Sequence, residues 1–113
     1  MDCLFCKIIN GEIPSEKLYE DELVYAFRDI DPKAPTHFLI VPKEHIPSAD
    51  DLEERHKNLI GHVFLVAKKI CAEEGLTKGY RIVNNCKEDG GQTVEHLHFH
   101  VLGGRSLNWP PGW

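Results

Sequence analysis

Residues 95–102 alternate histidine with apolar side chains, and this pattern constrains the fold more than any other part of the chain. The segment reads Glu-His-Leu-His-Phe-His-Val-Leu, which places histidine at His96, His98 and His100. A period of two predicts a β-strand, on which alternate side chains share a face and lie roughly 6.5 Å apart. Three imidazoles on one face suit nucleophilic or proton-transfer chemistry, or metal binding. A polar sheet face without chemistry is the alternative.

The size and charge of the chain limit the classes of protein that it can be. With 113 residues, of which 42 % are hydrophobic, the sequence predicts one domain (residues 1–113) with a core that needs no covalent staples. It shows no signal-peptide pattern and no stretch near the roughly 20 apolar residues of a membrane span. The net charge of −5 argues against non-specific nucleic-acid binding, although local amides and histidines can hold a small anion. We expect a cytoplasmic protein with no membrane or nucleic-acid partner.

Hydrophobic periodicity predicts an α+β fold. We expect a short helix at residues 3–9 and one long helix that begins at residues 51–54 and ends at Gly75. His56 and His62 belong to this long helix, and we expect them to be exposed and without chemistry. Strands are expected at residues 17–20, 23–28, 37–42, 80–85 and 95–102, the last two forming a hairpin across a polar loop. The sum is an antiparallel five-stranded sheet with the long helix on one face.

The polar loop before the histidines contains Gly90 and Gly91, followed by Gln92 and Thr93. Glycine lets backbone N–H groups turn toward a ligand and lets a phosphate approach without a Cβ in the way. The two residues that follow add a neutral donor and a hydroxyl. A Gly-Gly pair alone predicts only a turn, but beside three histidines we interpret it as an anion cradle next to a nucleophile.

A Cys-x-x-Cys pair, Cys3 and Cys6, opens the first helix. Such a pair is a redox pair, half of a zinc site, or a coincidence. No thioredoxin-like βαβ pattern surrounds it, which weakens the redox interpretation. A zinc site needs two more ligands from distant parts of the chain, and His45 and His96 are the candidates. The other two cysteines, Cys71 and Cys86, complete no regular disulfide framework, so we expect a reduced protein.

Asp29 and Ile30 follow an apolar strand. A carboxylate at a strand end could bind the two hydroxyls of a ribose, with Ile30 against a base. Read in isolation, Asp29 is a turn residue ahead of Asp31-Pro32.

The segment His96-Leu97-His98-Phe99-His100-Val101-Leu102 fits the motif His-φ-His-φ-His-φ-φ, in which φ is apolar, and on this motif the chain resembles the histidine triad (HIT) family. Segments similar to the family follow one another in the expected order at residues 5–9, 12–14, 29–30, 34–39, 90–92 and 102–105. The tail Trp109-Pro110-Pro111-Gly112 resembles the Hint branch, the nucleoside phosphoramidases. The dinucleoside polyphosphate hydrolase branch usually lacks this ending, and the uridylyltransferase branch has glutamine at the position of His100.

This resemblance implies a homodimer whose two sheets join into ten strands, and hydrolysis of P–N bonds in purine nucleoside phosphoramidates. It makes His98 the nucleophile, with the catalytic group formed by His98, His100, His96, His37 and Thr93. The implied nucleotide-binding residues, which include a base pocket, a ribose carboxylate and the α-phosphate contacts, are Phe5, Ile13, Phe27, Asp29, Ile30, Leu39, Asn85, Gly91, Gln92, Thr93, His98 and His100, with Trp109 near the partner's pocket.

The resemblance also implies zinc bound by Cys3, Cys6, His45 and His96. His96 would then point its ring at the metal while its backbone carbonyl orients His98. Two other functions stay open at this point: a dinucleoside polyphosphate hydrolase, and a nucleotide-binding scaffold with negligible turnover.

Overall fold

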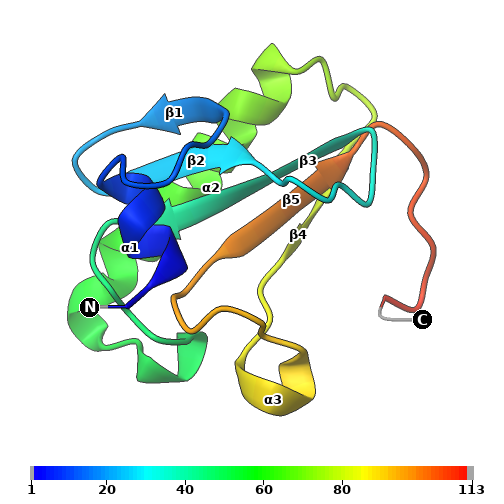
Figure 1. The fold of residues 1–113 in the computed structure, drawn as a ribbon. Helices are drawn as coiled ribbons and strands as arrows, with labels where there is room; N and C mark the ends of the chain where they lie inside the picture. Colours follow the sequence, from blue (N-terminus) through cyan, green and yellow to red (C-terminus); the bar gives the residue numbers. More distant parts are fainter. Residues whose placement is uncertain (1, 112–113) are drawn as a thin grey trace.

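A computed structural model describes residues 2–111, which form a sheet with helices on both faces (Figure 1). Two single 3-10 turns, Ala49–Asp51 and Glu54–His56, precede the longest helix. The helices and strands in chain order are α1 (Leu4–Ile9), β1 (Lys17–Glu20), β2 (Val24–Arg28), β3 (Thr36–Pro42), α2 (Lys57–Glu73), β4 (Tyr80–Val83), α3 (Lys87–Gly90) and β5 (Phe99–Gly103).

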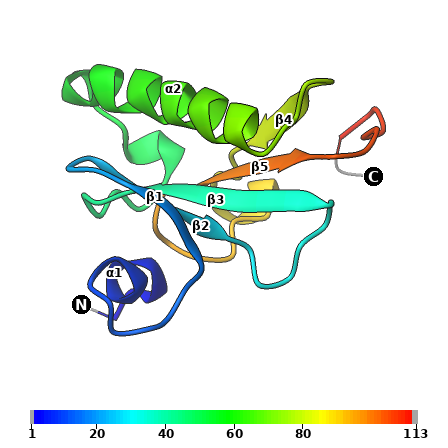
Figure 2. The ribbon, with the colours of Figure 1, turned by 90° about the horizontal axis from the view of Figure 1, so that it is seen from above.

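The five strands form one antiparallel sheet in the order β1-β2-β3-β5-β4, as the sequence predicts. Seen from above, α2 lies along one face and α1 lies on the other (Figure 2). The two strands that carry the expected site, β3 and β5, are neighbours near the middle of the sheet. No helix within residues 2–111 has the length and apolarity that a bilayer crossing requires.

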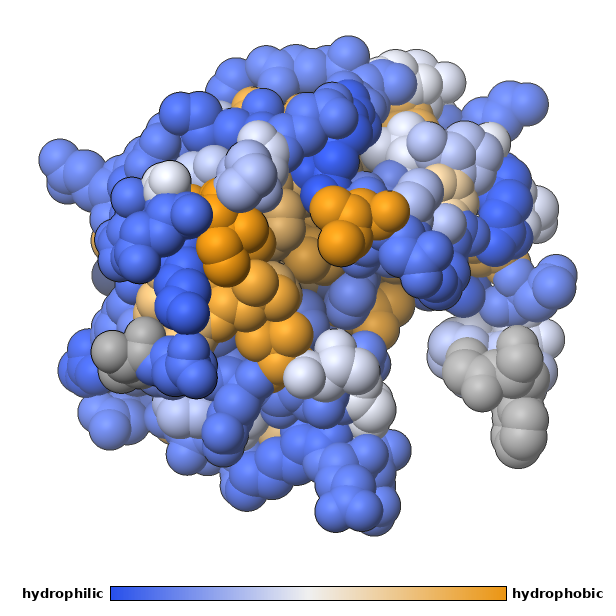
Figure 3. Space-filling model, viewed as in Figure 1, coloured by the Kyte–Doolittle hydropathy of each residue, from blue (hydrophilic) through white to orange (hydrophobic). Residues whose placement is uncertain are grey.

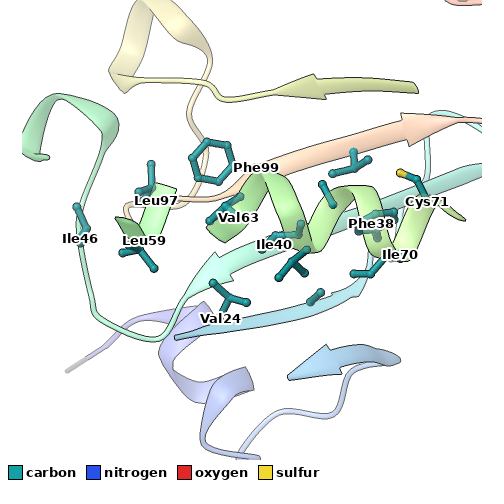
Figure 4. Close-up of a cluster of buried hydrophobic side chains, with 14 residues drawn as sticks. Val24, Phe38, Ile40, Ile46, Leu59, Val63, Ile70, Cys71, Leu97 and Phe99 are labelled. Atoms are coloured by element: carbon teal, nitrogen blue, oxygen red, sulfur yellow. The ribbon is translucent and has the colours of Figure 1, made fainter. Parts of the chain in front are cut away.

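The main core lies between the sheet and α2 (Figure 4). Phe38 and Ile40 of β3 point into it and meet Val63 and Ile70 of α2. Each such side chain, when fully buried, contributes roughly 1.5–3 kcal/mol to folding. A second apolar cluster lies under α1, where Phe5 and its neighbours pack on the opposite face of β2 and β3. β2 and β3 are therefore covered on both faces, which explains why residues 37–42 form a nearly continuous apolar run.

The strand expected at residues 95–102 begins only at Phe99, so His96 and His98 precede it. The ladder between β3 and β5 stops at this point because β3 ends at Pro42, which has no N–H to donate. Leu97 donates its N–H to Ile46 O instead. The alternation of faces nevertheless continues through the irregular segment: Leu97 joins the core under α2, while His98 packs against Phe5 on the α1 side.

The long helix starts later than the sequence predicts, at Lys57 instead of residues 51–54. Leu52 and Glu53 adopt extended backbone angles between the two 3-10 turns, which separates the acidic residues from α2. His56 is buried, contrary to expectation, because its ring accepts a hydrogen bond from the Glu53 N–H and contacts the Glu44 carboxylate. The C-terminal end of α2 agrees with the prediction, since Gly75 has φ +75° just beyond the helix.

Candidate functional site

The ring of His98 is held in one tautomer by a backbone carbonyl. His98 Nδ1 lies 2.7 Å from His96 O, and because a carbonyl only accepts, Nδ1 carries the proton. In the neutral ring, the lone pair is then on Nε2. Among residues 2–111, no group forms a hydrogen bond with Nε2, yet every fully buried side-chain nitrogen or oxygen in this range has a partner. Nε2 is therefore open to a ligand even though His98 as a whole is 3 % exposed.

Two neighbours fix the position of His98. The Phe5 ring meets the imidazole edge to face, with ring centroids 5.0 Å apart. Asn84 donates from Nδ2 to His98 O at 2.9 Å, which anchors the backbone of the segment that has no ladder partner on β3. Asn84 is a positioning residue that the sequence analysis missed, since nothing in its local pattern indicates a partner 14 residues away.

A chain of hydrogen bonds sets the tautomers of the two flanking histidines. The Lys33 N–H donates to His37 Nδ1 at 3.0 Å, so the proton of the neutral His37 ring is on Nε2. His37 Nε2 lies 2.9 Å from His100 Nδ1, which accepts that proton's hydrogen bond. The neutral His100 ring then carries its own proton on Nε2. His100 is thereby prepared to donate a hydrogen bond to an anionic ligand.

The histidines of this group are held neutral. Burial lowers the pKa of His98 and of His37. The hydrogen bond to His96 O and then the Asp29 carboxylate offset part of this effect for His98, and Asp29 offsets part of it for His37. Burial, followed by the proximity of His98 and His37, lowers the pKa of His100 to about 4. At neutral pH the group therefore offers lone pairs and N–H donors in place of positive charge, which is the state that a histidine nucleophile needs.

A cavity of about 420 Å³ opens beside the rings of His37 and His100, and Asp29, Asn85 and Thr93 also line it. Asp29 Oδ1 accepts the Asp31 N–H at 2.8 Å, and Oδ2 lies 3.4 Å from His37 Nε2. Oδ2 keeps accepting capacity toward the cavity. One opening is thus shared by groups that lie far apart in the sequence: the Asp29 carboxylate, His37, His100 and Thr93.

The glycine loop differs from the expected anion cradle. The N–H groups of Gly91 and Gln92 donate to Glu88 O and Lys87 O, where they close the C-terminal end of α3. The side-chain amide of Gln92 donates to Pro47 O and Val94 O. The loop is held together by its own hydrogen bonds, and of residues 91–93 only Thr93 lines the cavity beside the histidines.

The residues expected around a base fall into two groups. Phe5, Phe27 and Leu39 are buried in the cluster under α1, with Ile13 packed against them. Ile30 is 99 % exposed and lies outside that cluster. Figure 3 shows apolar side chains gathered beside α1 on the face that carries the site, with hydrophilic residues around them. Trp109 is 80 % exposed on the segment that follows β5.

Cys3, Cys6, His45 and His96 converge into a candidate metal centre, as the sequence predicts. Cys3 Sγ lies 3.3 Å from His96 Nδ1, and Cys6 Sγ lies 3.4 Å from His45 Nδ1 and 3.6 Å from His96 Nδ1. The two Nδ1 atoms are 3.1 Å apart. Tetrahedral zinc at ordinary bond lengths requires donor separations of roughly 3.3 Å between two nitrogens and roughly 3.6 Å between nitrogen and sulfur. The cluster therefore fits zinc.

The protonation of His96 supports the same fit. Its Nε2 lies 2.8 Å from Pro42 O and carries the proton, which leaves the lone pair of Nδ1 directed into the cluster. Burial, and then the neighbouring Cys3 thiol, raise the pKa of Cys6 to about 11, so ionisation of this thiol needs a nearby cation. Asp29, His37 and His100 also lie close enough for a metal. The neutral His37 ring, however, offers that group an N–H and no lone pair.

The fold and site define a protein with a carbonyl-oriented histidine beside a Cys2His2 cluster, and comparison with known proteins agrees. The HIT domain model matches residues 10–107, and the chain belongs to this family. It is 54 % identical over 111 residues to an uncharacterised HIT-like protein of Synechococcus elongatus, covering 98 % of this chain and 97 % of that protein. It is 52 % identical to a 14 kDa zinc-binding protein of Zea mays, covering 96 % of this chain and 87 % of the relative.

Solved structures show the same fold. A HIT family hydrolase from Legionella pneumophila superposes with a TM-score of 0.96 at 50 % identity, covering 98 % of this chain and all of the other. A histidine triad protein from Clostridium difficile gives a TM-score of 0.92 at 50 % identity, with 96 % of this chain and 95 % of the other covered. These similarities establish the family and the fold, while the substrate has to be argued from the site.

Proposed function

We propose that this protein is a nucleoside phosphoramidase of the Hint branch, which hydrolyses the P–N bond of adenosine or guanosine 5′-phosphoramidates through a nucleotidyl-histidine at His98. One observation carries the proposal. His98 Nδ1 is bound to His96 O at 2.7 Å, which leaves an accessible Nε2 lone pair on a ring whose pKa is lowered by burial. A nucleophile with these properties attacks phosphorus without first having to lose a proton.

In the first step, the lone pair of His98 Nε2 forms a bond to phosphorus while the P–N bond to the leaving amine breaks. The bonding electrons go to the amine nitrogen, which takes up a proton from solvent, because neutral His100 has a single ring proton and keeps it as a hydrogen-bond donor. His100 Nε2–H and the Thr93 hydroxyl are the donors that face the phosphoryl oxygens. Water then cleaves the nucleotidyl-histidine and restores His98. Phosphoryl transfer depends mainly on positioning and charge stabilisation. The His98 ring, held between His96 O and Phe5, provides the positioning.

Asp29 is proposed to bind the ribose hydroxyls, because its Oδ2 faces the cavity beside His37 and His100. The base would lie against the apolar cluster under α1, with exposed Ile30 closing over it. Asn85 lines the same cavity and is available to the phosphate. Gly91 and Gln92 act indirectly in this scheme, since they shape the loop that presents Thr93.

Zinc is the metal that Cys3, Cys6, His45 and His96 are proposed to hold, and the relative from Zea mays is a zinc-binding protein. When bound, zinc supplies a structural cross-link and no contact with substrate. His96 connects the two sites: its ring belongs to the metal cluster, and its carbonyl orients His98. Cys3 and Cys6 tie α1 to this segment.

A homodimer is proposed from the two apolar features left at the sheet edge and on α2. β4 is an edge strand with exposed Tyr80, and α2 exposes Phe64 and Leu65. Pairing two β4 edges would cover these two edge strands and form a ten-stranded sheet, with Trp109 near the partner's site. Light scattering at micromolar concentration is expected to give twice the chain mass, and a monomer would contradict the dimer.

Trapping of the covalent intermediate tests the proposed function. Acid quenching within one turnover, followed by peptide mass spectrometry, should show a nucleoside monophosphate on His98 with adenosine or guanosine 5′-phosphoramidate as substrate. His62→Ala, which changes a histidine paired with Asp21 away from the site, serves as the matched control and should still form the adduct. Nucleotide binding with no adduct on any substrate would instead favour a scaffold.

A parallel panel separates the two hydrolase functions. Phosphoramidates and dinucleoside polyphosphates are compared by kcat/KM under one set of conditions. Faster cleavage of dinucleoside polyphosphates would contradict the phosphoramidase assignment while leaving His98 as the nucleophile.

A further inference from the structure

A second cavity, of about 480 Å³, adjoins the cavity beside the histidines. The two share Lys33, Val83, Asn85 and Leu102 in their walls, so a ligand can extend from one into the other. The rest of the second cavity is built by Arg81, Arg105 and the segment after β5, which leaves the sheet at the end away from α1 (Figure 1). Its size is within the range of small-molecule sites.

The two cavities have opposite charge. The first has Asp29 and Asp31 in its wall. The second has Lys33, Arg81 and Arg105, and none of the described residues that line it is acidic. Lys33 is neutralised by Asp31. The excess positive charge of the second cavity therefore comes from its two arginines, in a chain whose net charge is −5.

These arginines differ from the other two arginines of the chain. Arg28 pairs with Glu16 and Glu74, and Arg55 pairs with Glu44 and Glu53. Within residues 2–111, neither Arg81 nor Arg105 forms a salt bridge with a carboxylate.

Backbone carbonyls hold the two guanidinium groups in place instead. Arg81 Nη2 donates to Asn108 O at 2.9 Å, and Arg105 donates to Ser106 O at 3.0 Å and Lys33 O at 2.9 Å. The carbonyls orient the groups without neutralising them, and each retains N–H donors. This arrangement is a preorganised site for an anion.

The sheet register places this site next to the reacting groups. Arg81 lies opposite Leu102, and Val83 lies opposite His100, so all four share one face of the sheet. Arg81 and Val83 are therefore separated by roughly 7 Å along the strand. A substituent a few atoms long on a phosphorus that accepts a hydrogen bond from His100 would reach the guanidinium groups.

We infer that the second cavity receives the leaving group, and that Arg81 and Arg105 select a leaving amine that carries an anion: the carboxylate of an amino acid joined to the nucleotide through nitrogen. This inference rests on the proposed P–N hydrolysis and names its substrate class. A further phosphate, as in a dinucleoside polyphosphate, presents the same chemistry to the arginines. In the amino-acid case the P–N bond breaks as described above, and the released amine takes up one proton while its carboxylate is unchanged.

Matched substrates test the charge directly. Adenosine 5′-phosphoryl-glycine and its glycinamide analogue share the P–N bond and differ in the anion. The wild-type protein should cleave the P–N bond of the glycine compound with a kcat/KM about tenfold or more above that of the glycinamide compound, as a charge-assisted hydrogen bond implies. In Arg81→Met and Arg105→Met the advantage should shrink, with glycinamide cleavage unchanged. Arg55→Met, whose arginine pairs with Glu44, should retain the full advantage.

A binding measurement keeps this test independent of turnover. In a His98→Ala background, calorimetry should give tighter binding of the glycine compound, and adding Arg81→Met or Arg105→Met should abolish the difference. A binding preference without turnover by the wild type would support the inference and contradict the proposed function. Equal binding and equal kcat/KM for the two compounds would overturn the inference even if both are cleaved.

A third arm identifies the anion. Diadenosine polyphosphates are compared in the same variants. If the arginine substitutions lower their cleavage and leave the glycine compound unaffected, the anion is phosphate, and the assignment to amino acids is wrong.

Discussion

The backbone carbonyl of His96 lies 2.7 Å from His98 Nδ1, while the ring of His96 points the other way, 3.3 Å from Cys3 Sγ. One residue thus belongs to the candidate metal centre through its side chain and to the candidate active site through its main chain. A shift of His96 would change both the donor set and the orientation of the nucleophile. The two sites can nevertheless be separated by experiment, because their other residues do not overlap.

Replacing His98 by alanine should reduce kcat by at least about a thousandfold, because the ring supplies the covalent bond. Binding of a nucleoside monophosphate should change little, since the ring provides small contact area to the ligand. The fold should be retained with a lower thermal midpoint, because a buried ring that packs on Phe5 is lost. Steady-state kinetics and calorimetry measure the two effects. Retention of more than about a tenth of the activity would exclude His98 as the nucleophile.

Replacing His37 by alanine should lower kcat more than it changes KM, by roughly a hundredfold, which is the scale of a single acid–base group. His37 fixes the tautomer of His100 through the 2.9 Å contact between their rings, and its loss lets the His100 proton move to the wrong nitrogen. Asparagine at this position, which can offer a donor, should restore part of kcat. A change confined to KM would instead indicate a binding role.

Purified protein should contain about one zinc per chain, and Cys3→Ser/Cys6→Ser should contain none. Removal of zinc by a chelator should lower the thermal midpoint more than it lowers kcat at a temperature where the protein stays folded, because the metal contacts no substrate. Elemental analysis of protein made without a metal-binding tag checks the content. Cys86→Ser, a half-buried thiol outside the cluster, is the matched control. Zinc retained by the double variant would refute the site.

Stability should fall as the pH drops below about 6.5, the ordinary pKa of histidine. Burial lowers the pKa of His100 to about 4 and also lowers that of His37. Between these values the unfolded chain binds protons that the folded chain does not, so the free energy of unfolding decreases with falling pH. The contribution of these histidines to the free energy of unfolding is fully present above pH 6.5, and the contribution of His100 is lost by about pH 4. Thermal unfolding should show a smaller slope over this range in His100→Gln than in the wild type.

A further acid-side contribution comes from Asp21 at the turn between β1 and β2. Burial raises its pKa, but hydrogen bonds from His62 and from the Val24 and Leu23 amides outweigh this and hold the pKa below the usual 3.8. Its contribution to stability is present above that value and is lost at lower pH. The two windows therefore adjoin, and the His100→Gln variant distinguishes them.

Periodicity in the sequence determined the architecture and the faces of the elements. The alternation at residues 95–102 correctly separated histidines from core residues, because side chains alternate in extended backbone whether or not the ladder is formed. The strand itself starts at Phe99, since Pro42 ends the ladder from the neighbouring strand. The start of α2 was likewise misplaced, because acidic residues suit a 3-10 turn as well as a first helical turn.

The motifs also identified the four metal-centre residues, and the tertiary structure shows that they meet. What the sequence by itself could not determine is the proton position on each ring. That depends on partners brought from distant segments, Pro42 O for His96 and His37 for His100 across 63 residues, and on the local loop that directs the Lys33 N–H to His37. It also depends on whether an amide is already used, as those of Gly91 and Gln92 are. Residue types are encoded locally, whereas hydrogen-bond partners and the charge of a cavity arise only when distant segments pack together.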